Sequence, residues 1–314
     1  MRPLTKPLTP PLANRRERTT RTPCVDTPRG ACAADEAKGT LILIGGSSTP
    51  DGAALGAFIS AVQALDGPIV GITAASADPR GSAALWVRDF ASVGVRDVTF
   101  PEGSRSDERA DRELAACIDG AAGVFLGGGD QVKLVAELSG TRAEAAMKRL
   151  FQRGGAVCGT SAGAAALTSL TMAGGEVDDE GQLVEQYIGP GFGLLGYDTI
   201  VDTHFRKRRR LQRLFVVIAA NPQLLGLGID ENTALVVRGH IGEVVGAGGV
   251  TFVDGRDSVR FDNAGDLDRG RQLTLSHLRV GIVGTHYHLD LRTRELDVLV
   301  RGEPSPHVRH VLAR

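Results

Sequence analysis

The sequence predicts an α/β protein built on a mostly parallel sheet, and two features carry that prediction. From residue 39 to about residue 224, short apolar runs alternate with longer segments whose apolar residues recur at helical spacing. Some of the apolar runs end in glycine-rich turns, such as Gly45-Gly46 and Gly127-Gly128-Gly129. Strands that alternate with helices form parallel sheets with helices on both faces, and reactive groups then collect at the carboxyl ends of the strands.

The expected elements follow one another closely along this part of the chain. Residues 51–65 illustrate a helix, because apolar residues from Leu55 to Leu65 recur on one face. We expect strands at 40–44, 68–73, 97–100, 124–126 and 156–158. We expect helices at 51–65, 81–93, 107–118, 131–138 and 141–152.

After about Leu224 the pattern changes to short strands separated by glycine and turn residues, which predicts antiparallel hairpins that continue or flank the sheet. These strands are expected at 226–229, 234–237, 243–245, 250–253 and 273–283. Because the chain shows no internal repeat and no linker, we expect one catalytic domain over 39–314. Residues 1–38 hold six of the fourteen prolines and are expected to form a disordered tail.

Composition excludes several classes of partner. With 36 basic and 37 acidic residues the net charge is -1, so no overall field draws the protein to nucleic acid or to a membrane. No apolar run approaches the roughly 18 to 20 residues of a membrane span. The four cysteines do not form a disulfide framework, and Cys117 and Cys158 stand among apolar residues and are expected to be buried. This inventory suits a reducing cytoplasm.

The run Cys158-Gly159-Thr160-Ser161-Ala162-Gly163 has the outline of a nucleophile elbow, a sharp strand-to-helix turn that exposes a serine hydroxyl. A side chain at Gly159 or Gly163 would collide in so tight a turn. Serine becomes a strong nucleophile only when a base takes its proton, an acid orients the base, and N–H donors stabilise the oxyanion. The elbow therefore predicts partners elsewhere in the chain.

The run Val201-Asp202-Thr203-His204-Phe205 supplies a candidate base, since His204 follows a short strand. The basic run over 206–213 invites a nucleic-acid interpretation. Apolar residues from Leu211 onward recur at helical spacing, however, so the basic run begins an amphipathic helix and only some of its side chains can face one site. Arg208, Arg210 and Arg213 could bind carboxylates in bidentate fashion.

Residues 174–181 form an acidic loop between these two motifs. Clustered carboxylates could hold a metal ion, but the spacing differs from that of an EF-hand, and we expect no metal. The loop is either a solvated turn or the source of a carboxylate that orients His204. His286 and His288 alternate on an expected strand and would share one face, as ordinary strand residues.

Together these motifs resemble the cyanophycinase family, with the aspartyl dipeptidases (peptidase E) as more distant relatives. The matching pieces follow the family order over nearly the whole chain after residue 38. They are LILIGG, FLGGGDQ, CGTSAGAAAL, the double glycine with its acidic loop, VDTHF with RxRxxRL, LLGLGIDENTAL, GGVTFVDGRD and LSHLR.

The resemblance implies that Ser161 is the nucleophile and His204 its base. The family's third triad member is a glutamate a few residues after the double glycine. Glu180 is the counterpart if the loop has a one-residue insertion, and Glu176 is the second choice. The resemblance further implies a class I glutamine amidotransferase-like fold with three layers, no cofactor, and a homodimer.

The resemblance also implies the surroundings of the serine. The backbone N–H of Ala162 and a glycine N–H of the turn at Gly128 and Gly129 would form the oxyanion hole, which the elbow predicts independently. Positions that line the family's substrate pocket correspond to Gln131, Asp202, Thr203, Arg208, Arg210 and Arg213.

The implied substrate is a polyaspartate backbone with arginine joined to each β-carboxyl, and the product is β-aspartyl-arginine, formed through an acyl-enzyme. The arginine cluster would hold substrate carboxylates while Asp202 receives a substrate guanidinium. The chain departs from the family at Thr203, where glutamine is usual, and at Ser47-Ser48-Thr49, which replace acidic residues. Two alternatives stay open: an aspartyl or isoaspartyl peptidase acting on a small peptide, and a non-catalytic protein that binds an acidic ligand.

Overall fold

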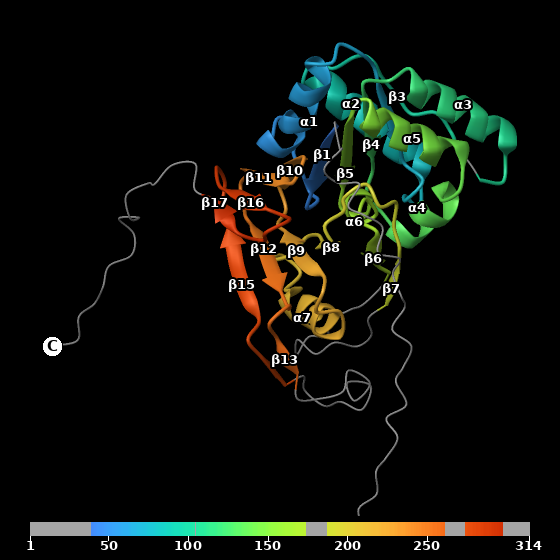
Figure 1. The fold of residues 1–314 in the computed structure, drawn as a ribbon. Coiled ribbons are helices and arrows are strands. Elements are labelled where there is room, and N and C mark those ends of the chain that lie inside the picture. Colours follow the sequence, from blue (N-terminus) through green and yellow to red (C-terminus); the bar gives the residue numbers. More distant parts are fainter. Residues whose placement is uncertain (1–38, 104, 174–186, 261–273, 298–314) are drawn as a thin grey trace, which may run out of the picture. The chain divides into compact units, whose positions relative to one another are not determined.

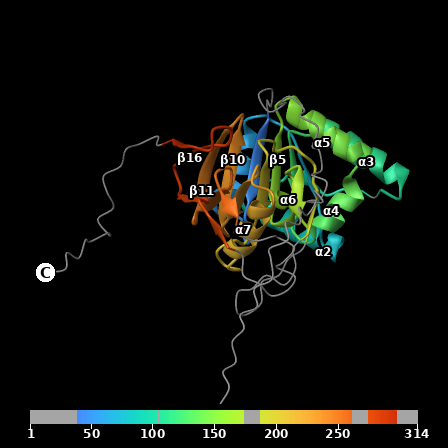
Figure 2. The same ribbon diagram turned by 60° about the horizontal axis from the view of Figure 1, so that its bottom comes forward.

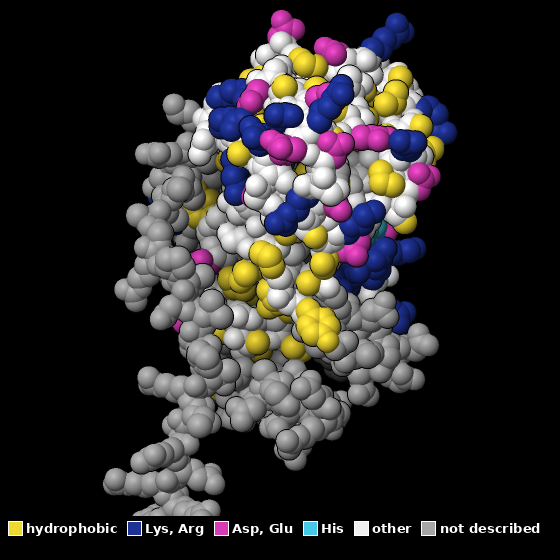
Figure 3. All heavy atoms as spheres, turned by 90° about the vertical axis from the view of Figure 1, so that its right-hand side faces the viewer, with side chains coloured by type: hydrophobic (Ala, Val, Ile, Leu, Met, Phe, Trp, Pro, Cys, Tyr) yellow, Lys and Arg dark blue, Asp and Glu magenta, His cyan; other side chains and the backbone are white. Residues whose placement is uncertain are grey.

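The computed structural model describes residues 39–103, 105–173, 187–260 and 274–297, all within one compact unit of the chain. The expected tail at 1–38 and the acidic loop at 174–181 lie outside these residues. Within the described chain no helix is long and apolar enough to cross a membrane. Figure 3 shows acidic and basic side chains interspersed over one face, as a net charge of -1 would suggest.

A nine-stranded sheet forms the centre of the described residues, in the order β17-β16-β11-β10-β1-β5-β4-β2-β3 (Figure 1). The parallel strands are β1 (Thr40–Ile44), β2 (Ile69–Ile72), β3 (Val98–Thr99), β4 (Gly123–Leu126) and β5 (Ala156–Thr160). The antiparallel extension is β10 (Thr233–Arg238), β11 (Ile241–Gly246), β16 (His288–Asp290) and β17 (Leu296–Asp297). The mixed α/β fold with a largely parallel sheet is therefore confirmed.

Seven helices are assigned in the described residues, and four of the longer ones begin at a side-chain cap. The helices are α1 (Ala53–Gln63), α2 (Pro79–Ser92), α3 (Glu108–Asp119), α4 (Gln131–Leu138), α5 (Arg142–Gln152), α6 (Ala162–Ala165) and α7 (Leu211–Ala220). Asp78, Asp107, Asp130 and Thr141 accept hydrogen bonds from backbone N–H groups in the first turns of α2 to α5. These caps satisfy donors that a helix start leaves unpaired.

Both faces of the large sheet are buried, so its central strands are continuous apolar runs. Along β1, Leu41 and Leu43 join the core that includes α3, α4, α5 and α6. Ile42 and Ile44 join the core on the other face, with α1 and α2. Figures 1 and 2 show α3, α4 and α5 toward one end of this sheet and the antiparallel strands β10, β11 and β16 toward the other.

A second sheet of four strands has the order β15-β12-β9-β8. Its strands are β8 (Thr199–Asp202), β9 (Leu225–Ile229), β12 (Val250–Asp254) and β15 (Arg279–Val283). The antiparallel strands expected after residue 224 are confirmed, since β12 pairs antiparallel with β9 and β15, and β10 with β11. β8 lies before that region and runs parallel to β9, because α7 carries the chain back between them. Two small ribbons complete the described strands: β6 (Leu170–Met172) with β7 (Ile188–Pro190), and β13 (Val259–Arg260) with β14 (Leu275–Ser276).

The structure corrects two expectations about single residues. Cys158 is buried in β5 as expected, but Cys117 is exposed, because its position on α3 faces away from the core residues Leu114 and Ile118. His286 precedes β16 and has a φ of 72°, so it does not share a strand face with His288.

We predict that Phe125→Ala lowers the free energy of unfolding by about 3–5 kcal/mol, as expected for a buried aromatic side chain. Phe125 is fully buried, and its ring centroid lies 4.5 Å from that of Trp86 and 5.4 Å from that of Phe90. Urea unfolding would measure the loss. The control is Leu85→Ala on α2, where the side chain is 52% exposed and the change should stay within about 0.5 kcal/mol. Equal losses in the two variants would contradict the assignment of this core.

Candidate active site

The turn between β5 and α6 holds Ser161 in a strained backbone conformation. Its φ of 53° and ψ of -114° lie in a region that residues with side chains rarely adopt. A Cβ on Gly159 would overlap the backbone of Gly163, and a Cβ on Gly163 would overlap the carbonyl oxygen of Leu126. The predicted need for glycine at both positions is confirmed, and the strand and helix meet here as closely as a nucleophile elbow requires.

A chain of two hydrogen bonds leads away from this serine. Ser161 Oγ lies 2.8 Å from His204 Nε2, and His204 Nδ1 lies 2.7 Å from Glu231 Oε1. His204 is buried, while the Glu231 side chain is 29% exposed. Serine, histidine and carboxylate in this order form the arrangement that activates a serine for nucleophilic attack.

Glu231 is the residue that the sequence analysis missed. It follows β9 by two residues, just as His204 follows β8 by two residues. Because β8 and β9 are parallel, their carboxyl ends lie at the same edge and bring the two side chains together. The acidic residues directly after the buried strand β9 were the available signal in the sequence, but nothing there showed that β8 and β9 are neighbours. Glu180 and Glu176, the predicted acids, lie outside the described residues.

The backbone at residues 44–46, after β1, positions all three members of this chain. The carbonyl oxygens of residues 44, 45 and 46 accept hydrogen bonds, in that order, from the N–H groups of Ser161 (2.9 Å), His204 (2.7 Å) and Asn232 (3.0 Å). Asn232 is the neighbour of Glu231 in the chain. The imidazole of His204 lies so close to residue 46 that a Cβ there would overlap the ring, and the φ of +98° also favours glycine.

Local electrostatics keep the histidine neutral and the glutamate ionised. Burial is the largest cause that lowers the pKa of His204, and the positive charges of Arg208 and Arg210 lower it further. The hydrogen bond from His204 is the largest cause that lowers the pKa of Glu231. A neutral imidazole can accept the proton of Ser161, and an ionised carboxylate can stabilise the imidazolium that results.

Asp202 contacts the protein's own arginines, which differs from the predicted contact with a substrate guanidinium. Arg213 binds both carboxylate oxygens through Nε and Nη2, with 2.7 Å from Nε to Oδ2. Arg210 Nη1 and the N–H of Thr203 also donate to Oδ1, at 3.1 and 2.8 Å. Asp202 and Arg213 are both buried, so each offsets the cost of burying the other's charge.

The arginines of the basic run therefore fall into different environments. Arg213 is buried in the pair with Asp202, whereas the exposed side chain of Arg208 has no hydrogen-bond or ion-pair partner within the described part of the chain. Arg210 is intermediate, and it uses Nη1 for both Asp202 and the carbonyl of Thr203. Burial is the largest cause that lowers the pKa of Arg210, to about 10, which still leaves it charged at neutral pH. As predicted, only part of the run can face a site.

The two remaining pocket candidates make backbone contacts. The Gln131 side chain, at the start of α4, donates to the carbonyl oxygen of Met172 in β6. Thr203 is buried next to His204, and its backbone contacts hold Asp202 and Arg210. The structure thus places Gln131 at the end of the turn that follows β4, and Thr203 in a buried position between Asp202 and His204.

The predicted oxyanion-hole residues Ala162 and Gly128 both lie close to the serine. Ala162 is the first residue of α6, where a helix leaves its N–H groups without intrahelical acceptors. The Cα of Gly128 lies beside the serine, because a Cβ added there would stand 3.4 Å from Ser161 Cβ. Among the described residues the N–H groups of Gly128 and Gly129 have no hydrogen-bond acceptor. Within the same residues no group of three His, Cys, Asp or Glu side chains could hold a metal ion.

Comparisons with known proteins identify the family of this chain. Residues 88–245 match the protein family described as Peptidase family S51. The cyanophycinase of Synechococcus elongatus is 34% identical over 264 residues, which cover 82% of this chain and 81% of that protein. This chain belongs to peptidase family S51. The cyanophycinase of Trichormus variabilis is 34% identical over 227 residues, or 71% of this chain and 75% of that protein.

A solved structure shows the same fold. The crystal structure of a peptidase from an acI-B1 Actinobacterium superposes with a TM-score of 0.54 at 22% identity, covering 70% of this chain and 93% of that one. The coarse α/β architecture is therefore shared with that peptidase. The family resemblance is confirmed by the S51 match and the cyanophycinase relatives.

We predict that Asp202→Asn lowers the free energy of unfolding by about 3–5 kcal/mol, because it leaves the charge of Arg213 buried without a partner. The double variant Asp202→Asn with Arg213→Met should lose less than the sum of the two single losses. A double-mutant cycle by urea unfolding would measure this coupling. Additive losses would show that the pair is not coupled, and normal stability of Asp202→Asn would argue for a role in substrate binding alone.

We predict that Arg208→Gln raises the pKa of His204, since it removes a positive charge that disfavours the imidazolium. An NMR titration of the His204 imidazole would measure the shift. Arg209→Gln is the matched control, because Arg209 is the exposed neighbour in the same run and is not among the causes of the His204 shift. Equal shifts in the two variants, or a lower pKa in Arg208→Gln, would contradict the prediction.

Proposed function

We propose that this S51 peptidase is a serine exopeptidase that hydrolyses cyanophycin, multi-L-arginyl-poly-L-aspartate, to β-aspartyl-arginine dipeptides. The observation that carries the proposal is the hydrogen-bonded chain from Ser161 through His204 to Glu231. The cyanophycinase relatives, at 34% identity over 82% of the chain, support the choice of substrate.

In the proposed mechanism Ser161 Oγ attacks a backbone aspartyl carbonyl while His204 Nε2 takes its proton. Glu231 accepts a hydrogen bond from the Nδ1–H of His204 and stabilises the imidazolium. The N–H groups of Ala162 and Gly128 bind the oxyanion. His204 then donates its proton to the leaving amine, and water hydrolyses the acyl-enzyme with His204 again as the base.

The same site offers complementary charges to a substrate of alternating carboxylates and guanidiniums. The side chain of Arg208 is exposed, and its charge lowers the pKa of His204 more than the charge of Arg210 does, so we assign Arg208 a substrate carboxylate. Arg210 keeps Nε and Nη2 for a second carboxylate contact, since its recorded bonds use Nη1. Asp202 and Arg213 shape the wall behind these groups, and Gln131 and Thr203 border the pocket.

We further propose a class I glutamine amidotransferase-like arrangement of three layers in a single catalytic domain over 39–314. The three-layer arrangement is supported by the helices that pack on each of the two faces of the large sheet. A cytoplasmic homodimer completes the proposal, with the cysteine inventory as support for the compartment and the family resemblance as support for the dimer.

The triad makes a direct prediction about catalysis. Ser161→Ala should abolish the release of β-aspartyl-arginine from the polymer, and Glu231→Gln should lower kcat by about 10⁴-fold because the imidazolium loses its stabilising charge. The assay is chromatographic quantification of the released dipeptide. Glu180→Gln and Glu176→Gln are the matched controls, and both should keep wild-type kcat.

Two results would contradict this assignment. The triad acid would be Glu180, in the loop after the double glycine, if Glu180→Gln lost most of its kcat while Glu231→Gln kept a near-normal kcat. Faster turnover of small aspartyl or isoaspartyl dipeptides than of the polymer would keep the triad but replace the substrate.

A further inference from the structure

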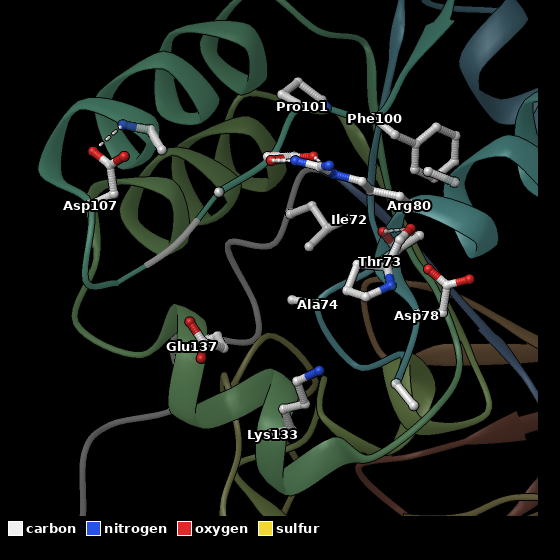
Figure 4. Close-up of a pocket in the computed structure, with 16 residues that line it drawn as sticks. Ile72, Thr73, Ala74, Asp78, Arg80, Phe100, Pro101, Asp107, Lys133 and Glu137 are labelled. Atoms are coloured by element: carbon white, nitrogen blue, oxygen red, sulfur yellow. Dashed lines mark hydrogen bonds and ion pairs between the residues drawn. The ribbon is translucent and has the colours of Figure 1, made fainter.

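A cavity of about 670 Å³, separate from the catalytic residues, lies at the carboxyl ends of β2 and β3. The loops after these strands, the first turns of α2 and α3, and one side of α4 line it (Figure 4). Ser161, His204 and Glu231 are not among the residues that line it. Its volume falls within the roughly 300–1,000 Å³ that is usual for small-ligand sites. The proposed catalytic mechanism makes no use of this cavity.

Only one turn of backbone separates this cavity from the serine. Ala74 lines the cavity, and the carbonyl oxygen of the next residue, Ala75, accepts a hydrogen bond of 2.9 Å from the N–H of Asp130. The turn that ends at Asp130 contains Gly128, whose Cα lies beside Ser161. The serine and the cavity therefore lie near the same backbone turn.

Two side chains of α4 give the cavity charges of both signs. Lys133 and Glu137 stand one helical turn apart, a spacing at which lysine and glutamate often pair. They form no ion pair here, since Lys133 Nζ donates instead to the carbonyl oxygen of Ser76 at 2.6 Å. Within the described chain Glu137 is half-buried and has no hydrogen-bond or ion-pair partner. A partly buried carboxylate without a partner favours a cationic ligand.

The opposite wall carries a second pair of charges. Arg80, on the first turn of α2, and Glu102, after β3, form an ion pair of 2.5 Å across the cavity from α4 (Figure 4). Both side chains are largely exposed, so the pair can exchange partners at little cost. Cations and anions thus face the same space from two walls, which suits a ligand that itself carries both charges.

We infer that this cavity binds a further aspartyl-arginine unit of the polymer, several units away from the bond that is cleaved. Glu137 binds the guanidinium of that unit, Lys133 and Arg80 bind its one free carboxylate, and Glu102 binds the guanidinium of a neighbouring unit. The inference rests on the proposed function and adds to it a preference for long chains. A second contact on the same chain raises the affinity for long substrates and leaves short ones unaffected.

The experiment compares synthetic β-aspartyl-arginine oligomers of two and of four to eight units. Glu137→Gln should lower kcat/KM for the longer oligomers about tenfold, mainly through KM, because a hydrogen bond to a charged group is lost. It should leave kcat/KM for the two-unit substrate unchanged. Glu113→Gln, on α3 outside the cavity lining, removes the same charge and should change neither value. Wild-type enzyme should also lose its length preference when citrulline, a neutral isostere, replaces the arginines distant from the cleaved bond.

The outcomes separate this inference from the proposed function. The inference is overturned if the preference for long oligomers is unchanged both in Glu137→Gln and with the citrulline oligomers. Dipeptide release by the wild-type enzyme would still support the proposed function in that case. An equal loss on short and long substrates also overturns it, because the residue would then act on the catalytic site. Wild-type enzyme that releases no dipeptide from any oligomer overturns the proposed function, and the inference with it.

Discussion

Three consecutive carbonyl groups at residues 44–46 hold the candidate catalytic groups in register. Each accepts the backbone N–H of a different segment, from Ser161, His204 and Asn232, at 2.7–3.0 Å. The serine belongs to the large sheet, whereas the histidine and Glu231 follow strands of the second sheet, so these bonds join the two sheets where chemistry requires sub-ångström placement. The distances along the side-chain relay, 2.8 and 2.7 Å, are a consequence of this backbone connection.

The backbone around this junction is held in uncommon conformations. Ser161, His204 and Asn232 all have φ values between 50° and 53°, which cost free energy for residues with side chains. Such conformations persist only where the surrounding structure imposes them. Here the imposing elements are the close packing of Gly159 against Gly163 and the hydrogen bonds to residues 44–46. The strain thus coincides with the groups that we assign to catalysis.

How far sequence reasoning reached depends on the range of the interactions involved. The parallel strands and their helices were predictable because buried apolar runs and helical spacing are local patterns, and the elbow at Ser161 was predictable because its glycines answer a local steric need. Glu231 was not found, since its position depends on the parallel pairing of β8 and β9 across α7, which no local pattern reveals. The partner of Asp202 was unpredictable for a related reason. A basic run shows that cations are near, but only packing decides which of them, here Arg213, turns inward.

The division of the basic run explains how a protein with almost no net charge creates a strongly charged site. Arg213 turns inward, where Asp202 offsets its charge, and their pairing fixes the start of α7 against the end of β8. That anchoring leaves Arg208 on the outer side, close enough to lower the pKa of His204. Burial acts on the histidine in the same direction, while Glu231 opposes both. The base is therefore neutral before reaction, and the carboxylate of Glu231, already hydrogen-bonded to it, stabilises the imidazolium that forms when the proton of Ser161 arrives.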